Sequence, residues 1–80
     1  MPKIKHISGK EVIKIIESFG FVIVRQKGSH IILKRTISQD EQVILVPNHK
    51  TIDRGTLHSI YKKLLLYVDE SEIKSYFYSE

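Results

Sequence analysis

Cysteine is absent from this 80-residue chain. The protein therefore has neither disulfide bonds nor thiolate metal ligands, which fits a reducing compartment such as the cytoplasm. Its apolar runs are also far shorter than the roughly 18 residues that a membrane-spanning helix needs. The first residues, Met1–His6, lack the apolar core of a signal peptide. We therefore expect a cytoplasmic protein with no membrane segment.

Acidic residues are absent from the middle of the chain, between Glu17 and Asp40. Residues 1–40 carry eight Lys and Arg against three Asp and Glu, which gives a net charge of +5. Residues 41–80 carry five against six, which gives −1. A basic half with an acid-free centre favours a nucleic acid as ligand. Ordinary solubilising charge is the alternative explanation.

Three segments have the spacing of amphipathic helices. The first begins at the capping box Ser8–Glu11 and ends at Gly20, which can take the left-handed conformation after a helix. The second follows Asp53 or Thr56, either of which can cap it, and the third follows Asp69. Since 80 residues make one domain, we expect a single domain over residues 1–80.

Strands are expected where β-branched and aromatic residues gather, over residues 21–25, 30–35 and 42–46. Residues 27–29 read as a tight turn and residues 36–41 as a polar loop. The resulting order is α-β-β-β-α-α. We therefore expect an α+β fold, a three-stranded antiparallel sheet with helices on one face.

The expected strands carry consecutive apolar residues, as in Val22–Val24, Ile31–Leu33 and Val43–Val46. A sheet with one wet face would show alternation instead, so both faces are expected to be apolar at mid-strand. The helices of so short a chain cover one face, and the other becomes an apolar patch of the kind that marks a partner surface. The alternative is that the C-terminal helix covers the second face.

A Gly-Ser turn delivers His30 to the start of an apolar strand, between basic side chains. Histidine both takes and gives a proton readily near neutral pH, and cations attract a polyanion and stabilise developing charge. These properties suit an RNA-cleaving site, with His30 as the catalytic residue. The expected RNA-binding residues are Arg25, Lys27, Gly28, Ser29, Lys34, Arg35 and His49.

Five short motifs in this order resemble the HicA-type mRNA interferase toxins, the small partners of HicB antitoxins. They are Ser8–Glu11, Gly20–Phe21, Arg25–His30, Val46–His49 and Gly55–Leu57, the last followed by Ile60. The resemblance runs from about Ser8 to Leu65. It implies a fold like the double-stranded-RNA-binding domain and ribosome-independent cleavage of mRNA, with the histidine after Gly-Ser, here His30, as the catalytic residue.

The chain departs from the family pattern at two places. Many relatives have a second histidine where this chain has Ile31, so His30 acts alone or with lysines. Many have a glycine near the end of the second helix, where this chain reads Leu65–Tyr67. The role of His49 stays open between RNA contact and a hydrogen bond within its loop.

RNA carries its own nucleophile, the 2′-OH, so one histidine and a few cations suffice without metal. The spacing of the histidines and carboxylates predicts neither a metal site nor a cofactor. The four tyrosines can stack bases, but at helical spacing they are more typical of packing.

The resemblance also implies a HicB-type antitoxin, which we expect to cover the His30 edge and the uncovered sheet face. It should carry acidic residues against Arg25, Lys27, Lys34 and Arg35.

Two other functions fit the same composition. One is a non-catalytic RNA-binding module of the double-stranded-RNA-binding type, which would keep its main lysines on a helix N-terminus and a loop. Lys62 and Lys63 lie in mid-helix by spacing, which argues against it. The other is a family member that has lost catalysis and is kept for partner binding.

Overall fold

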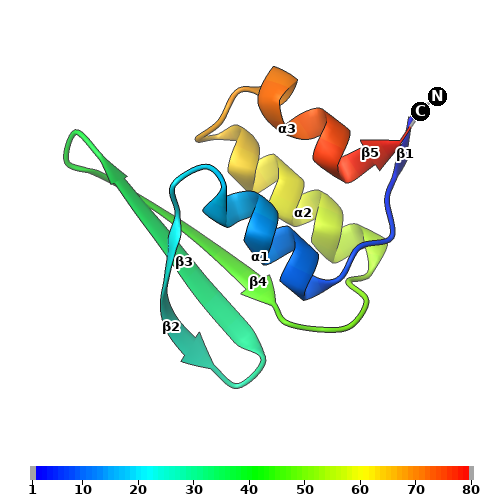
Figure 1. Cartoon of the computed structure of the whole chain (residues 1–80), viewed down its shortest axis with the longest axis horizontal. Helices are drawn as coiled ribbons and strands as arrows, with labels where there is room; N and C mark the ends of the chain where they lie inside the picture. The colour runs from blue at the N-terminus through cyan, green and yellow to red at the C-terminus, as the bar shows by residue number, and fades with distance from the viewer. Residues whose placement is uncertain (1, 80) are drawn as a thin grey trace.

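The computed structural model describes residues 2–79 of the chain and has the expected α+β architecture. Its elements are β1 (Lys3–Ile4), α1 (Gly9–Glu17), β2 (Val22–Lys27), β3 (His30–Ile37), β4 (Asp40–Pro47), α2 (Arg54–Leu65), α3 (Glu70–Phe77) and β5 (Tyr78–Ser79). Strands β2, β3 and β4 form an antiparallel sheet with β3 in the centre. The helices lie on one side of it, as the sequence predicts (Figure 1). Within residues 2–79, no helix is long and apolar enough to cross a membrane.

Side-chain caps begin all three described helices. In the capping box of α1, the Glu11 backbone N–H donates to Ser8 Oγ (3.2 Å) and the Ser8 N–H donates to the Glu11 carboxylate (3.0 Å). Asp53 caps α2 by accepting from the Thr56 N–H, so of the two candidates Asp53 is the cap. Asp69 caps α3. Each cap satisfies an amide that a helix start leaves without a partner.

The hydrophobic core fills the space between the sheet and the helices α1 and α2. Alternate residues of β3 and β4 are buried there, among them Leu33 and Ile44, each 1% exposed or less. Helix α3 packs on α2 and not on the sheet, since the Phe77 ring lies 5.3 Å from the Tyr61 ring. The possibility that the C-terminal helix covers the second sheet face is therefore wrong.

The sheet face turned away from the helices, here called the outer face, carries exposed apolar residues as expected. Val22, Val43 and Leu45 are 58%, 41% and 47% exposed. The strand register places Val22 and Val43 on either side of Lys34, and Leu45 beside Ile32. Directly opposed residues project to the same face of a sheet, so these side chains form one surface.

The expectation of a polar loop over residues 36–41 is wrong. Strands β3 and β4 continue to Ile37 and Asp40, and only Ser38 and Gln39 form the turn. Both have positive φ, 48° and 69°, as the tight hairpin turn that matches strand twist requires. Such turns usually carry Asn-Gly, and without that signal the sequence did not reveal how tight the turn of this expected hairpin is.

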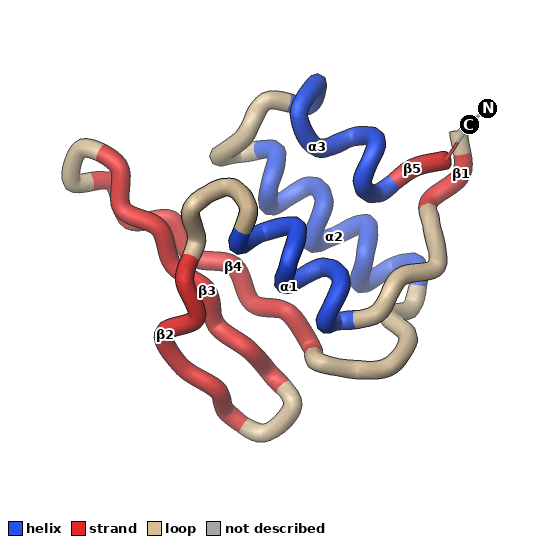
Figure 2. The backbone as a smooth tube through the Cα atoms, viewed as in Figure 1, coloured by secondary structure: helices blue, strands red, loops and turns tan. Residues whose placement is uncertain are grey.

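A second, two-stranded sheet was not expected from the sequence. Strand β1 pairs antiparallel with β5, and Lys3 lies opposite Ser79. This pairing brings the two ends of the described chain together beside α2 and α3 (Figure 2). Strands of two residues carry too little pattern to be recognised in a sequence.

Arg35 connects the sheet to the ends of two helices, a role that the sequence did not suggest. Its guanidinium donates to the carbonyls of Phe19 (2.7 Å) and Tyr67 (3.1 Å), which follow α1 and α2, and to Gln42 Oε1 (2.8 Å). It also lies over the Phe21 ring, 4.7 Å from its centroid. A cation at the carbonyl end of a helix is stabilised by the helix dipole as well as by hydrogen bonds.

Replacing Arg35 by alanine should lower the free energy of unfolding by about 2–4 kcal/mol, because three acceptors lose their donor. Chemical denaturation of the pure protein measures this. Arg25→Ala removes the same side chain from an exposed strand position and should change stability by no more than about 0.5 kcal/mol. Equal effects of the two substitutions would contradict the structural role of Arg35.

Candidate active site

His30 begins β3 and lies on the outer face of the sheet. The register places it directly between Lys27 of β2 and Pro47 of β4. The next residue, Ile31, is 4% exposed and faces the helices, whereas His30 is exposed. Opposed side chains on one sheet face lie about 5 Å apart at their Cβ atoms, so Lys27 is a close cationic neighbour of the imidazole.

A β-bulge in β2 turns its basic residues toward His30. Ile23 pairs with Leu33, but the next pair along is Arg25 with Ile32, so Val24 is an extra residue. A bulge of one residue exchanges the faces on which the following side chains point. Without it, Arg25 and Lys27 would face the helix side. The bulge therefore places both cations on the face of His30.

The turn before His30 is held by the segment that follows β4. Gly28 has a φ of 61°, a conformation that glycine adopts without strain. The Asn48 N–H donates to the Ser29 carbonyl (2.6 Å), and His49 Nε2 lies 3.3 Å from Ser29 Oγ. His49 thus makes a hydrogen bond that joins its own segment to the turn. The expected residues Gly28, Ser29, His30 and His49 are brought together.

Gly9, the first residue of α1, fixes that segment in turn. Its N–H donates to the carbonyl of His49 (2.8 Å). A Cβ atom at Gly9 would overlap the Pro47 carbonyl oxygen and would lie 2.7 Å from the Asn48 Cα. Only glycine allows this close approach, so α1 presses directly on the chain that carries His49.

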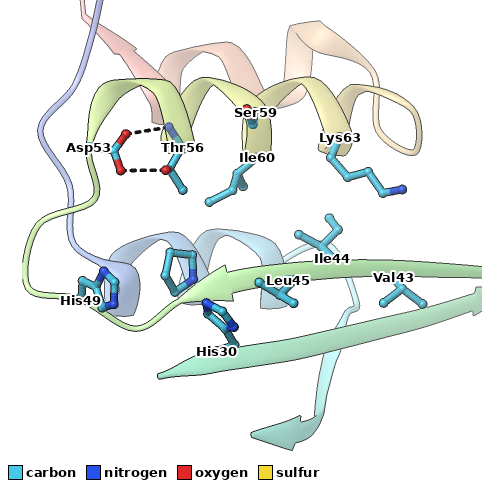
Figure 3. A pocket seen from close by; sticks show the side chains of 11 residues that line it. His30, Val43, Ile44, Leu45, His49, Asp53, Thr56, Ser59, Ile60 and Lys63 are labelled. Carbon is cyan, nitrogen blue, oxygen red and sulfur yellow. Dashed lines mark hydrogen bonds between the residues drawn. The ribbon is translucent and has the colours of Figure 1, made fainter. Parts of the chain in front are cut away.

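A hollow of about 580 Å³ opens beside His30, between β4 and α2. We call it the β4–α2 groove, and its lining includes His30, Leu45, Pro47, His49, Thr56 and Lys63. Figure 3 shows His30 and the β4 side chains on one side of it and the α2 side chains on the other. Its size is that of ordinary ligand sites. His30 and His49 therefore share one hollow, a point that the sequence left open.

Asp53 brings a negative charge to the groove. Its carboxylate accepts from the Thr56 hydroxyl (2.7 Å) and from the Thr56 N–H (3.0 Å). These bonds, the hydroxyl first, hold the pKa of Asp53 below its usual range. The carboxylate is thus ionised at neutral pH and stays so further into acid than a free aspartate.

The other two expected cations lie away from the imidazole. Lys34 is on the outer face, four residues along β3 from His30, which is about 13 Å. Its ammonium pairs with Glu41 at 2.7 Å. Arg35 points to the helix side, and its donors are used within the fold. Lys27 and Arg25 are therefore the expected cations that the structure brings nearest to His30.

The tyrosines that the sequence offered for base stacking mostly serve packing. Tyr61 is 4% exposed and donates to Glu70 (2.9 Å), and burial together with that bond raises its pKa to about 12. Tyr78 lies edge-on to Tyr61, and Tyr67 packs against Phe21. In the described part of the chain, His, Asp and Glu residues form no group of three or more that could hold a metal ion.

Sequence reasoning missed the α2 side of the site. Thr56, Ile60 and Lys63 have the spacing of one helix face, and all three line the β4–α2 groove. That periodicity was visible in the sequence. What it did not reveal is that this face borders β4, because the pairing of a helix with a sheet edge depends on the whole fold.

A family model described as the HicA toxin of bacterial toxin–antitoxin systems matches residues 9–66. The chain therefore belongs to the HicA family of toxins, as its motifs indicated. Neither a search of curated proteins nor one of solved structures found a match. The matched residues include all of α1, the turn before His30 and the whole of the β4–α2 groove.

Substituting Gly9 by alanine should lower the free energy of unfolding by about 1–3 kcal/mol, because the new methyl group displaces the backbone of the Pro47–His49 segment. The ring resonances of His49 should shift in NMR spectra. Gly55→Ala in α2 is the matched control, since the new Cβ would meet only the Asp53 side chain at 3.4 Å. That change should be neutral or stabilising, and a harmless Gly9→Ala would argue against the close approach.

Proposed function

We propose that this toxin is an endoribonuclease that cleaves mRNA without a metal ion, with His30 as its general base. The proposal is carried by one observation, the pairing of the exposed His30 with the exposed Lys27 on the outer face of the sheet. An accessible imidazole can take the proton of the 2′-OH, and a cation beside it can stabilise the charge that develops on the phosphate. Membership of the HicA toxin family supports the same function.

In the proposed reaction, His30 takes the proton of the 2′-OH. The O2′ then forms a bond to phosphorus, and the bond from phosphorus to O5′ breaks. The leaving O5′ takes up a proton from water, so the products are a 2′,3′-cyclic phosphate and a 5′-OH. Negative charge grows on the phosphoryl oxygens in the transition state, and nearby cations stabilise it.

We rank the cations for this role by their place relative to His30 in the strand register. Lys27 lies directly opposite the imidazole, and Arg25 is two residues further along the same face of β2. We assign the scissile phosphate to these two side chains. Lys34 is suited to a phosphate further along the RNA, and Gly28, Ser29 and His49 to the backbone near the turn. Because Arg35 is committed to the fold, we leave it out of the RNA site.

The antitoxin partner, implied by the family, is proposed to be a HicB-type protein that covers the His30 edge and the outer face together. The exposed Val22, Val43 and Leu45 supply apolar contact area. Arg25 and Lys27 would be complementary to acidic residues on the antitoxin. A stable complex of this kind buries about 1,200–2,000 Å² in total. We propose that both proteins act in the cytoplasm.

Removal of the general base tests the mechanism. His30→Ala should lower the rate of RNA cleavage by about 10²–10⁴-fold and abolish growth arrest. Its free energy of unfolding should stay near that of the wild type, because His30 is exposed. Gel analysis of RNA fragments and denaturation curves measure the two quantities.

The same assay separates this mechanism from its alternatives. An RNA with a single 2′-deoxy nucleotide at the cut should bind but remain whole. Cleavage of that RNA would indicate an activated water as nucleophile. Undiminished cleavage by His30→Ala would exclude His30 as base, whereas RNA binding without cleavage by the wild type would indicate a non-catalytic module.

The outer face can be tested away from the RNA site. Val22→Lys should weaken antitoxin binding about tenfold or more, since it places a charge in an apolar interface, and should leave RNA cleavage unchanged. The matched control is Leu66→Lys, at an apolar residue that is 71% exposed beyond the end of α2. Calorimetry with the purified antitoxin measures affinity. Equal affinities of the two variants would contradict an interface on the outer face.

A further inference from the structure

The β4–α2 groove contains more than general-base catalysis requires. Its lining has apolar side chains from both elements, Ile44 and Leu45 of β4 and Ile60 of α2. Thr56 with Asp53 lies toward one end and Lys63 toward the other, with Ser59 and His30 between them (Figure 3). An apolar hollow with a few placed polar groups is typical of a site that binds a flat organic ligand.

The hydrogen-bonding capacity at the Asp53 end is one-sided. Thr56 Oγ1 gives its only proton to Asp53 Oδ1 (2.7 Å), and the ionised carboxylate has none to give. Toward the groove, both side chains can therefore only accept hydrogen bonds. A ligand edge that meets them must carry N–H donors. A phosphate would be repelled by the carboxylate and is excluded from this end.

The opposite end suits a phosphate. Lys63 lies seven residues from Thr56 along α2, which is about 10 Å. Its side chain is exposed, with the ammonium 5.6 Å from the centroid of the Tyr67 ring. Along the groove, acceptors are thus followed by apolar side chains and then by a cation. A nucleotide has the complementary order, a base edge with donors, a flat apolar face and an anionic phosphate.

We infer that the β4–α2 groove binds one nucleobase of the RNA next to the cut, prefers bases with an exocyclic amino group, and uses Lys63 to hold a phosphate further along the strand. Adenine, cytosine and guanine carry such a group and uracil does not. The base packs on Leu45, which is 47% exposed, with its amino group toward Thr56 and Asp53. This inference rests on the proposed ribonuclease function and adds a specificity site to it.

Base preference is the first test. An RNA whose cut by the wild-type toxin has been mapped is varied at the bases beside the cut. Uridine, or purine riboside in place of adenosine, should lower kcat/KM at one of these positions about three- to tenfold, as expected for one lost hydrogen bond. Thr56→Val should reduce that preference, because one of the two acceptors is lost, so that kcat/KM falls more for the adenosine RNA than for the uridine RNA. Thr56→Ser keeps the hydroxyl and should keep the preference.

Salt dependence is the second test. In the His30→Ala background, in which cleavage is expected to be too slow to disturb a binding measurement, Lys63→Ala should weaken binding to all bases equally. It should also reduce the slope of log Kd against log salt by about 0.7, the value for one phosphate of a single strand. Lys62→Ala removes the same charge from the neighbouring position of α2, outside the groove, and should leave the slope nearly unchanged.

The outcomes separate this inference from the function beneath it. A wild-type protein that cuts no RNA would overturn both. RNA cleavage with a base preference that Thr56→Val does not alter, and with equal salt slopes for the Lys62 and Lys63 variants, would overturn the groove alone. If the Thr56 and Lys63 variants lost affinity for the antitoxin but not for RNA, the groove would be a protein-docking site. That result would also contradict the inference.

Discussion

The guanidinium of Arg35 holds the layers of this protein together. It donates to carbonyls that follow α1 and α2 and to Gln42 on β4, so one side chain binds both helix ends and the sheet. The expected cost of losing these bonds, about 2–4 kcal/mol, is a large share of the stability of so small a domain. Because the far end of α2 is fixed in this way, the separation of α2 from β4 is fixed as well. The groove beside His30 therefore depends on a residue that does not line it.

The sequence predicted those parts of the fold whose signals are local. The capping box at Ser8 requires residues three apart, and the core faces of the helices follow from spacing within one segment. The extra residue at Val24 left no such signal, because a bulge is defined by its partner strand. The same holds for Arg35, whose inward direction depends on strand register and whose acceptors come from three separate segments. Charge alone made it look like the other basic residues.

In the candidate site, too, the residues that are neighbours in the chain were predicted and those from distant segments were not. The Gly28–His30 turn was recognised because its residues are neighbours in the chain, and the structure adds His49 to it through Ser29. The opposite wall comes from α2, more than twenty residues later, and no pattern in the sequence connects the two. Gly9 illustrates how tightly they are connected in space. Because Gly9 has no Cβ, α1 can contact the backbone of the segment that carries His49. The position of His49 therefore depends on Gly9.

The bulge at Val24 has a consequence for the solubility of the toxin on its own. Strand β2 is one of the two edges of the three-stranded sheet, and Val22–Val24 is an exposed apolar run on it. Such an edge invites a second copy to pair with it and start a growing aggregate. An irregular step in the backbone, followed by the charges of Arg25 and Lys27, prevents two such edges from matching over more than a few residues. The feature that directs cations toward His30 thereby also disfavours the pairing of two β2 edges.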